Sequence, residues 1–334
     1  MASETTVVEQ QLADTANDHH TLKFIGALVG VPIVLLLMLM AFLVPSLHSG
    51  AKDLPLAVSG PDAAVQQVVG GLEQKQPGAF DVTTYATAQE ASDSVHNRDT
   101  IGAIAIEADG VHIVTASGAG TPYATLLKQI GAGLQSTGQN VVYEEVAPLT
   151  EKDPTGSSIA TLGLPLIFGG NVSAILLITM FKKHPLLRIF GGLAIALIGG
   201  YAVTAAMQYG FDVLSGNFWL TGLMLSLGIA AISMTLQGLY NLAGMAGVGV
   251  AAVILLFFSN PLSGLATGAA WLPKPWGLIG QLMPIGAAGT AIRSSAFFDG
   301  EGMTFSIWVL VIWTVIGLCL AAFFGKRQKR AASA

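Results

Sequence analysis

Long apolar runs alternate with one mixed stretch along this chain. The first 22 residues are polar, and the run from Phe24 to Leu47 carries no charge. A helix rises about 1.5 Å per residue, so this run is long enough to cross a hydrocarbon core of about 30 Å. The pattern predicts a disordered tail over residues 1–22 and a transmembrane helix over residues 23–47.

The stretch of residues 48–157 has a different pattern, in which short strand-like runs alternate with amphipathic helical runs. These runs are LPLAVSG, DAAVQQVVGGLEQ, FDVTTYA, AQEASDSVHNR, TIGAIAIEADGVHIVTAS, YATLLKQIGAGLQS and NVVYEEV. The EADGV turn predicts a hairpin within the fifth run. Residues 48–157 are therefore predicted to form a small α/β domain.

The chain is mainly apolar from Pro154 onward. We predict five further spans within residues 158–325, near Ile159–Met180, Ile189–Met207, Phe218–Leu239, Leu242–Phe258 and Thr304–Phe324. The predicted fold class is a polytopic α-helical membrane protein with six transmembrane helices and an α/β domain between the first two.

The segment Asn260–Gly300 is apolar, but prolines break it into short pieces. An unpaired backbone group in hydrocarbon costs several kcal/mol, so irregular chain at membrane depth must be covered by protein or line a cavity. We predict a re-entrant helical hairpin before the sixth helix, with helices near Trp276–Met283 and Ala287–Phe297 and a break at Pro284. The candidate gate residues are Asn260, Pro261, Pro273, Pro275, Trp276, Gly277, Gly280, Pro284, Gly286 and Arg293.

Three ionisable residues lie in this segment. Lys274 stands between Trp271 and Trp276, which is typical of an aromatic anchor in the headgroup layer. Arg293 has two interpretations: it pairs with Asp299 at the membrane surface, or it contacts a ligand.

Composition and charge agree with a membrane protein. Charged residues make up 10% of the chain and hydrophobic residues 52%, against about 25% charged in soluble domains. Lys and Arg near the predicted spans place both termini in the cytoplasm and residues 48–157 and 260–300 outside. The flanking positive residues are Lys23, Lys182, Lys183, Arg188, Lys326, Arg327, Lys329 and Arg330, the last four in a basic tail over residues 326–334.

The sequence shows no sign of catalysis. It lacks a GxxxxGK[ST] phosphate-binding loop, and its histidines lack metal-ligand spacing. The single cysteine, Cys319, excludes an intrachain disulfide. We expect no enzymatic activity, cofactor, metal or nucleic-acid partner. Glycines such as Gly192, Gly200 and Gly247 predict close helix packing, either inside one bundle or across a dimer.

This order of elements resembles the six-span permeases of the type-2 ABC exporter superfamily, including the phage-infection-protein-like and actinobacterial ABC permease branches. The pieces that carry the resemblance are LPLAVSG, AQEASDSVHNRDTIGAIAIEADG, NPLSG, LPKPWGLIGQLMPIGAAG and FFDG.

The resemblance implies a permease subunit in a bacterial plasma membrane that exports a lipid, glycoconjugate or drug. A separate cytoplasmic ATPase would energise it, and a homodimer or larger membrane complex is expected. The candidate coupling loop is Lys182, Lys183, His184 and Arg188. The alternative is a non-transporting scaffold or accessory subunit of an envelope lipid-export or protein-secretion complex, which docks partners through its outer domain.

Overall fold

The computed structural model describes the backbone of residues 2–331 and the side chains of residue 21 and residues 24–322. The chain divides into two compact units, one up to Leu47 and one from His48 onward. The first unit is a single helix, α1 (Ala2–Leu47). The backbone of residues 2–22 is thus helical, which differs from the predicted disordered tail. Residues 2–22 contain no Gly or Pro. The helix of the apolar run that follows can therefore extend back through them without interruption.

The second unit begins with a five-stranded mixed sheet in the order β2-β1-β3-β4-β5. Its strands are β1 (Leu54–Ser59), β2 (Phe80–Tyr85), β3 (Ala103–Glu107), β4 (Gly110–Thr115) and β5 (Val141–Glu145). Only β3 and β4 pair antiparallel, through the hairpin that the EADGV turn predicts. The predicted α/β pattern of this region is confirmed run by run.

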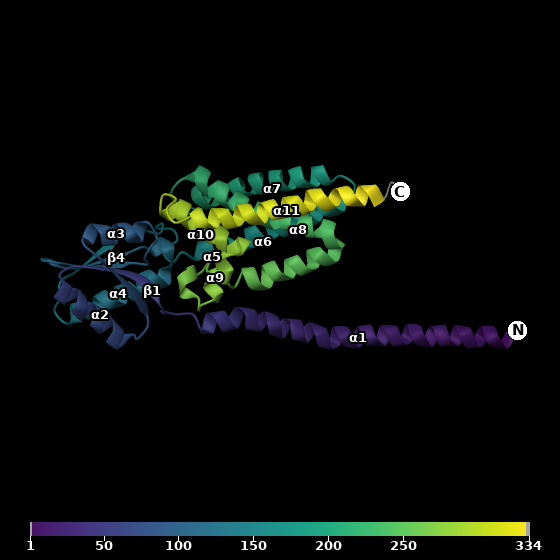
Figure 1. Cartoon of the computed structure of the whole chain (residues 1–334), viewed down its shortest axis with the longest axis horizontal. Helices are drawn as coiled ribbons and strands as arrows, with labels where there is room; N and C mark the ends of the chain where they lie inside the picture. The colour runs from purple at the N-terminus through teal and green to yellow at the C-terminus, as the bar shows by residue number, and fades with distance from the viewer. Residues whose placement is uncertain (1, 332–334) are drawn as a thin grey trace. The chain divides into compact units, whose positions relative to one another are not determined.

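Helices cover both faces of this sheet. Helices α2 (Asp62–Lys75) and α4 (Thr121–Ser136) lie on one face and α3 (Ala88–His96) on the other (Figure 1). Larger side chains such as Leu56 and Ile104 point toward α2 and α4. The face toward α3 carries small residues, including Ala57 and Ala103, which belong to the same buried cluster as the helical bundle. The sheet and the bundle therefore share one core.

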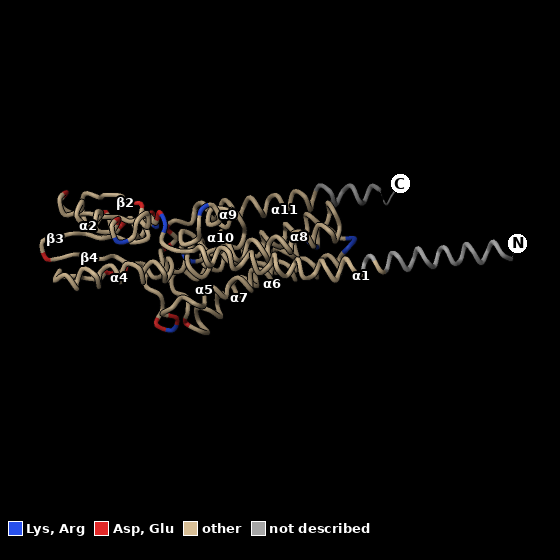
Figure 2. Tube along the Cα trace, turned by 90° about the horizontal axis from the view of Figure 1, so that it is seen from below, with Lys and Arg blue, Asp and Glu red and all other residues tan. Residues whose placement is uncertain are grey.

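The rest of the second unit is mainly helical. Its longer elements are α6 (Gly163–Met180), preceded by α5 (Ser157–Thr161), then α7 (Pro185–Ala205) with η2 (Ala206–Gly210), α8 (Phe218–Ile254) with η3 (Leu255–Ser259), and α11 (Thr304–Ala331). Charged side chains gather around the sheet and the loops, and the bundle carries few (Figure 2). Together with α1, the described residues contain five helices long and apolar enough to cross a membrane.

The long helix α8 reverses direction within its length. Thr221 near its start hydrogen-bonds Ser295 of α10 (Pro284–Phe297), and Ser259 in η3 accepts a bond from the backbone of Ile285 in the same helix. A straight helix would separate residues 221 and 259 by about 57 Å, whereas α10 is only about 21 Å long. The reversal lies at Ala243 and Gly244, whose backbone is not helical.

This reversal falls between the two spans predicted over Phe218–Leu239 and Leu242–Phe258. Figure 1 shows the chain doubling back there, in green. The second arm runs from about residue 245 to 259 and ends beside α10. The prediction of six spans is therefore compatible with the five long apolar helices but is not established by them.

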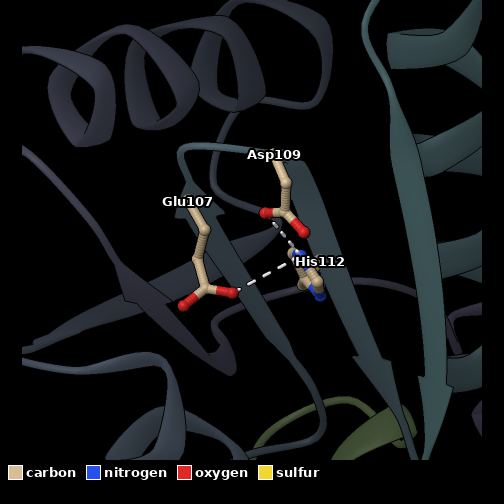
Figure 3. Close-up of side chains that lie close together, drawn as sticks. All are labelled: Glu107, Asp109 and His112. Carbon is tan, nitrogen blue, oxygen red and sulfur yellow. Dashed lines mark hydrogen bonds and ion pairs between the residues drawn. The ribbon is translucent and has the colours of Figure 1, made fainter.

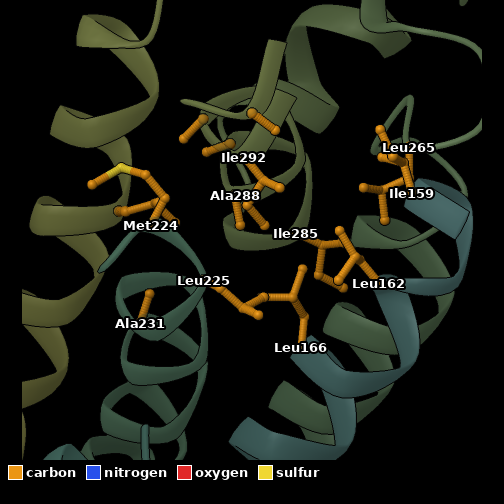
Figure 4. Packing of buried hydrophobic residues seen from close by; sticks show 14 of the residues in the cluster. Ile159, Leu162, Leu166, Met224, Leu225, Ala231, Leu265, Ile285, Ala288 and Ile292 are labelled. Carbon is orange, nitrogen blue, oxygen red and sulfur yellow. The ribbon is translucent and has the colours of Figure 1, made fainter. Parts of the chain in front are cut away.

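The shared core is centred on α10. Ile285, Ala288 and Ile292 project from α10 among Leu166 of α6 and Leu225 of α8 (Figure 4). Every residue of α10 except Thr290 is buried. A helix buried on all sides is apolar or small around its circumference, and the sequence PIGAAGTAIRSSAF meets this requirement except at Arg293.

Candidate functional site

The broken segment contains two short helices, close to where the sequence predicts them. Helix α9 (Trp276–Gln281) ends before Leu282, and α10 begins at Pro284. Pro284 is thus the first residue of α10 and not the break itself, because proline fits the first turn, where its missing N–H is not needed. The break lies at Leu282 and Met283. Leu282 accepts a hydrogen bond of 2.8 Å from the indole of Trp313 in α11.

Two of the candidate glycines permit a close approach of backbones. A Cβ atom at Gly280 would collide with the carbonyl of Leu262, and one at Gly286 would collide with the carbonyl of Gly280. The loop, α9 and the start of α10 are therefore stacked backbone on backbone. This arrangement explains why a proline-rich, glycine-rich segment is needed here.

The remaining candidate gate residues are spread along the segment. Asn260 and Pro261 follow η3 and are half-buried, with the Asn260 side chain against Gly163 of α6. Pro273 is half-buried, while Pro275 and Trp276 are exposed. Gly277 packs against the carbonyl of Ala269. The structure does not gather these ten residues into one pore lining. We refer to the stacked loop, α9 and the start of α10 as the stacked plug.

Arg293 is buried, with 3% of its surface exposed. Its Nη1 donates to the carbonyl of Gly118 in η1 (Ser117–Ala119) at 2.8 Å, and its Nη2 donates to the carbonyl of Leu265 at 2.7 Å. Both acceptors are neutral, and no ion pair involves Arg293 among the described residues. The predicted pair with Asp299 is wrong: Asp299 lies 4.0 Å from His96 instead and is exposed.

A second arginine crosses the same junction in the opposite direction. Arg98, just after α3, donates from Nη1 to the carbonyl of Thr290 at 3.1 Å and to the hydroxyl of Ser294 at 2.7 Å. Its guanidinium carbon lies 4.9 Å from the centre of the Phe298 ring. Arg98 of the sheet domain thus binds α10, and Arg293 of α10 binds the sheet domain. These reciprocal hydrogen bonds hold the sheet domain and α10 in one relative position.

Aromatic residues complete this junction. The hydroxyl of Tyr123 in α4 accepts a 3.1 Å hydrogen bond from the backbone of Trp271, and the two rings meet edge to face at 5.7 Å. Lys274 forms an exposed ion pair with Asp53 at 3.3 Å. Trp271 and Lys274 therefore bind the sheet domain and do not form the lipid anchor that the sequence suggests. Of the two tryptophans, Trp276 is the one that keeps the exposed position that such an anchor requires.

The candidate coupling loop is shorter than predicted. Helix α6 ends at Met180 and α7 begins at Pro185, and Lys182, Lys183 and His184 between them are exposed. Arg188 lies inside α7 and is buried, where it donates to the side chain of Asn241 at 2.8 Å. Placing Arg188 in the loop was wrong, because Pro185 starts the helix a turn earlier than the apolar run suggests.

A row of polar side chains lies inside the bundle, which sequence reasoning missed. Ser226, Ser233, Gln237 and Asn241 occupy one buried stripe of α8. Ser173 of α6 hydrogen-bonds Ser233, Gln237 contacts Ser233 at 3.4 Å, and Asn241 also donates to the carbonyl of Ala321 in α11. The spacing of four between residues 233, 237 and 241 was visible in the sequence and is the signal that could have found this row.

Several donors and acceptors at one end of this polar row have no protein partner. Within the described part of the chain, Nε and Nη1 of Arg188 and Oε1 of Gln237 are buried without a hydrogen bond. Buried polar groups are usually paired, so such a group needs a water or a ligand. The row therefore places unpaired polar groups inside the bundle, where other buried polar side chains such as Thr204 and Thr235 also lie.

The glycines behave as packing residues inside the second unit. A Cβ atom at Gly192 would meet Gln237, and one at Gly200 would meet Ser226. Gly247 lies against the carbonyl of Leu239 at the reversal of α8. These contacts support the packing interpretation. Gly199, Gly244 and Gly249 have open space around them, so the contacts of the second unit do not explain these three glycines.

The outermost hairpin of the sheet domain carries a cluster of ionisable side chains (Figure 3). Nε2 of His112 lies 3.1 Å from Asp109 and 3.4 Å from Glu107. The hydrogen bond from His112 holds the pKa of the Asp109 carboxyl below its usual range. Both carboxylates are exposed to solvent, and the hydrogen bond of His112 goes to Asp109. We interpret this cluster as a solvated hairpin tip.

The same hairpin borders a groove of about 810 Å³ between α2 and α4. Val68, Leu72 and Ile130 supply apolar surface, and Gln67 and Asn140 supply polar groups. It lies on the sheet domain, and no residue of α10 lines it.

Comparisons with known proteins add no family assignment. No protein-family model matches the chain, and no curated protein matches it. The functional argument therefore rests on the residues and contacts above.

Proposed function

We propose that this protein is the membrane-spanning permease subunit of an exporter, energised by a separate ATPase. The observation that carries the proposal is the polar row on α8, which runs inside the bundle below the stacked plug of α9 and α10. A polar interior closed at one end is the arrangement expected of a transport path in its resting state. Ionisable residues that face the interior of a transmembrane bundle are candidates for a substrate path, and the buried Arg188 lies at one end of this row.

The proposed orientation puts the sheet domain, α9 and α10 outside and the α6–α7 connection in the cytoplasm. Six crossings follow if both arms of α8 span the membrane. Lys182 and Lys183 then lie on the cytoplasmic side, in agreement with the positive-inside bias. The unpaired groups of Arg188 and Gln237 lie at the cytoplasmic end of the path, where an exported lipid, glycoconjugate or drug would enter.

A separate ATPase would have a small contact surface on this subunit. Among the described residues of the α6–α7 connection, the exposed side chains are Lys182, Lys183 and His184. Reversing both lysine charges (Lys182→Glu with Lys183→Glu) should remove an ATPase that recognises this loop. The matched control is Lys128→Glu, an exposed lysine on α4 of the sheet domain.

The test is affinity purification of the full-length protein in mild detergent, followed by mass spectrometry. We expect a P-loop ATPase to copurify with the wild type and with Lys128→Glu, and to be lost from the double variant. Recovery of no ATPase from wild-type membranes, with the subunit itself intact, would contradict energisation by a separate ATPase.

The groove between α2 and α4 favours a second candidate function, a scaffold that docks an envelope partner. Its size and mixed polarity suit a peptide or a loop of another protein. Deleting the whole sheet domain would expose the core that it shares with the bundle, so a point change is the better test. Gln67→Trp places a large ring in the groove, and Gln66→Trp, exposed but outside it, is the control.

The two functions predict different effects on the proteins that copurify. If the scaffold function is correct, Gln67→Trp should remove a copurifying envelope protein that Gln66→Trp retains. If the permease function is correct, neither change should affect the recovery of the ATPase.

A further inference from the structure

A separate cavity of about 320 Å³ lies where the sheet domain meets α9, α10 and the start of α11. The sheet domain contributes Arg98 and Tyr123 to its walls, α9 and α10 contribute Gln281 and Thr290, and α11 contributes Ser306. No aspartate or glutamate lines it. The wall is therefore cationic and rich in hydrogen-bonding groups, without a carboxylate of its own.

Arg98 has donors to spare. A guanidinium carries five N–H groups, and among the described residues the side-chain hydrogen bonds of Arg98 all come from Nη1, to Thr290 and Ser294. Nε and Nη2 donate to no protein atom in the described part of the chain, and no carboxylate lies within ion-pair distance of Arg98. Desolvation lowers the pKa of Arg98 to about 10, so the group remains cationic at neutral pH.

A second cation and a phenol lie near Arg98. Arg293, which is bonded only to neutral carbonyls, lies close enough for the two positive charges to interact. Burial raises the pKa of the Tyr123 phenol to about 12, so Tyr123 keeps its proton. Its oxygen accepts from Trp271, and among the described residues the phenol proton has no acceptor. Two cations and a neutral hydroxyl donor thus stand together without a counter-charge.

We infer that this cavity binds a phosphate group. A phosphate presents several oxygens to the planar fork of Arg98 and to the hydroxyl of Tyr123, and arginine–phosphate pairs of this kind are among the stronger hydrogen bonds in proteins. The mouth is bordered by Leu278 and Phe305, apolar side chains that are 63% and 52% exposed. That border suits a phosphate carried on a lipid as well as a soluble one. The inference concerns binding and does not depend on transport.

The test measures binding to the full-length protein purified in mild detergent. The probes are inorganic phosphate, glycerol 3-phosphate, dihexanoyl phosphatidic acid and dihexanoylglycerol, which carries the same chains without phosphate. We expect phosphatidic acid to bind at least about tenfold more tightly than dihexanoylglycerol, as the loss of charge-assisted hydrogen bonds implies. Inorganic phosphate that binds as tightly as phosphatidic acid would identify a soluble source. Binding of phosphatidic acid alone would identify a lipid headgroup.

Two variants address the site by different routes. Arg98→Lys keeps the charge but loses the fork, and should weaken phosphatidic acid binding by about tenfold. Ala270→Phe fills the cavity from an exposed wall position and removes no hydrogen bond. Ala266→Phe, exposed on the same loop but outside the cavity, is the matched control and should bind like the wild type.

Three results would overturn the inference. They are equal binding of phosphatidic acid and dihexanoylglycerol, wild-type affinity in Ala270→Phe, and binding of none of the phosphate probes. If Arg98→Lys fails to elute as a folded species in size-exclusion chromatography, Ala270→Phe decides the question alone.

Discussion

Arg293 belongs to the packing of the molecule, and its surroundings define what a substitution there should do. The side chain closes the contact between α10 and η1 through the carbonyls of Gly118 and Leu265. The sequence could indicate that its charge needed an explanation. It could not supply this explanation, because both acceptors are backbone groups that any residue carries.

Arg293→Met should therefore act through stability. The change keeps most of the side-chain volume but leaves two buried carbonyls without donors, which costs about 1–3 kcal/mol each. We expect the free energy of unfolding in mild detergent to fall by about 2–5 kcal/mol. Lys128→Met, which removes an exposed charge, should change it by less than about 0.5 kcal/mol. An unchanged free energy of unfolding in Arg293→Met would contradict this packing role and would favour the interpretation of Arg293 as a ligand contact.

The polar residues of the bundle show a different limit of sequence reasoning. Ser233, Gln237 and Asn241 are spaced for one helix face, so their alignment could be predicted from the sequence. Arg188 could not be added to them, because it follows two lysines and a histidine in a segment that reads as a cytoplasmic loop. Only the start of α7 at Pro185 turns Arg188 toward Asn241.

At the scale of elements, the sheet domain is where sequence patterns were most informative. Each strand-like and helix-like run appears at its predicted place, since alternation and turn residues act locally. The reversal of α8 was predicted only as a gap between two spans. The structure locates it at Gly244, with φ 63° and ψ −149°. Residues that carry a Cβ atom rarely adopt this backbone conformation.

Gly244→Ala should consequently destabilise the protein even though open space surrounds the position. Backbone strain of this kind costs about 1–3 kcal/mol. The matched control is Gly249→Ala in the second arm of α8, where there is also open space and the backbone is helical. It should be neutral or stabilising by up to about 1 kcal/mol. Thermal unfolding of the purified proteins measures the difference, and equal midpoints for the two variants would show that α8 does not reverse at Gly244.

At the scale of the whole molecule, the sheet domain and the bundle of the second unit form one body. The buried residues on the α3 face of the sheet belong to the same cluster as the bundle, and Arg98 and Arg293 cross the junction in opposite directions. Hydropathy could separate an α/β domain from apolar spans, but it could not indicate that the two share a core. The small residues Ala57 and Ala103 on one sheet face mark where the bundle packs.

This body has two distinct ends. Helix α6 starts beside the sheet domain and runs for 18 residues, about 27 Å, before the α6–α7 connection. The permease proposal requires these ends to lie on opposite sides of the membrane. It requires the stacked plug and the phosphate cavity to be outside, and Lys182 and Lys183 to be in the cytoplasm.

The most direct measurement is labelling of single cysteines in intact cells with a membrane-impermeant maleimide, in a Cys319→Ser background. Gln66→Cys reports on α2 of the sheet domain, and Lys183→Cys reports on the α6–α7 connection; both positions are exposed. We predict that Gln66→Cys is labelled in intact cells and that Lys183→Cys is labelled only after the cells are permeabilised. Labelling of both positions in intact cells, or the reverse pattern, would contradict the proposed topology and the transport function built on it.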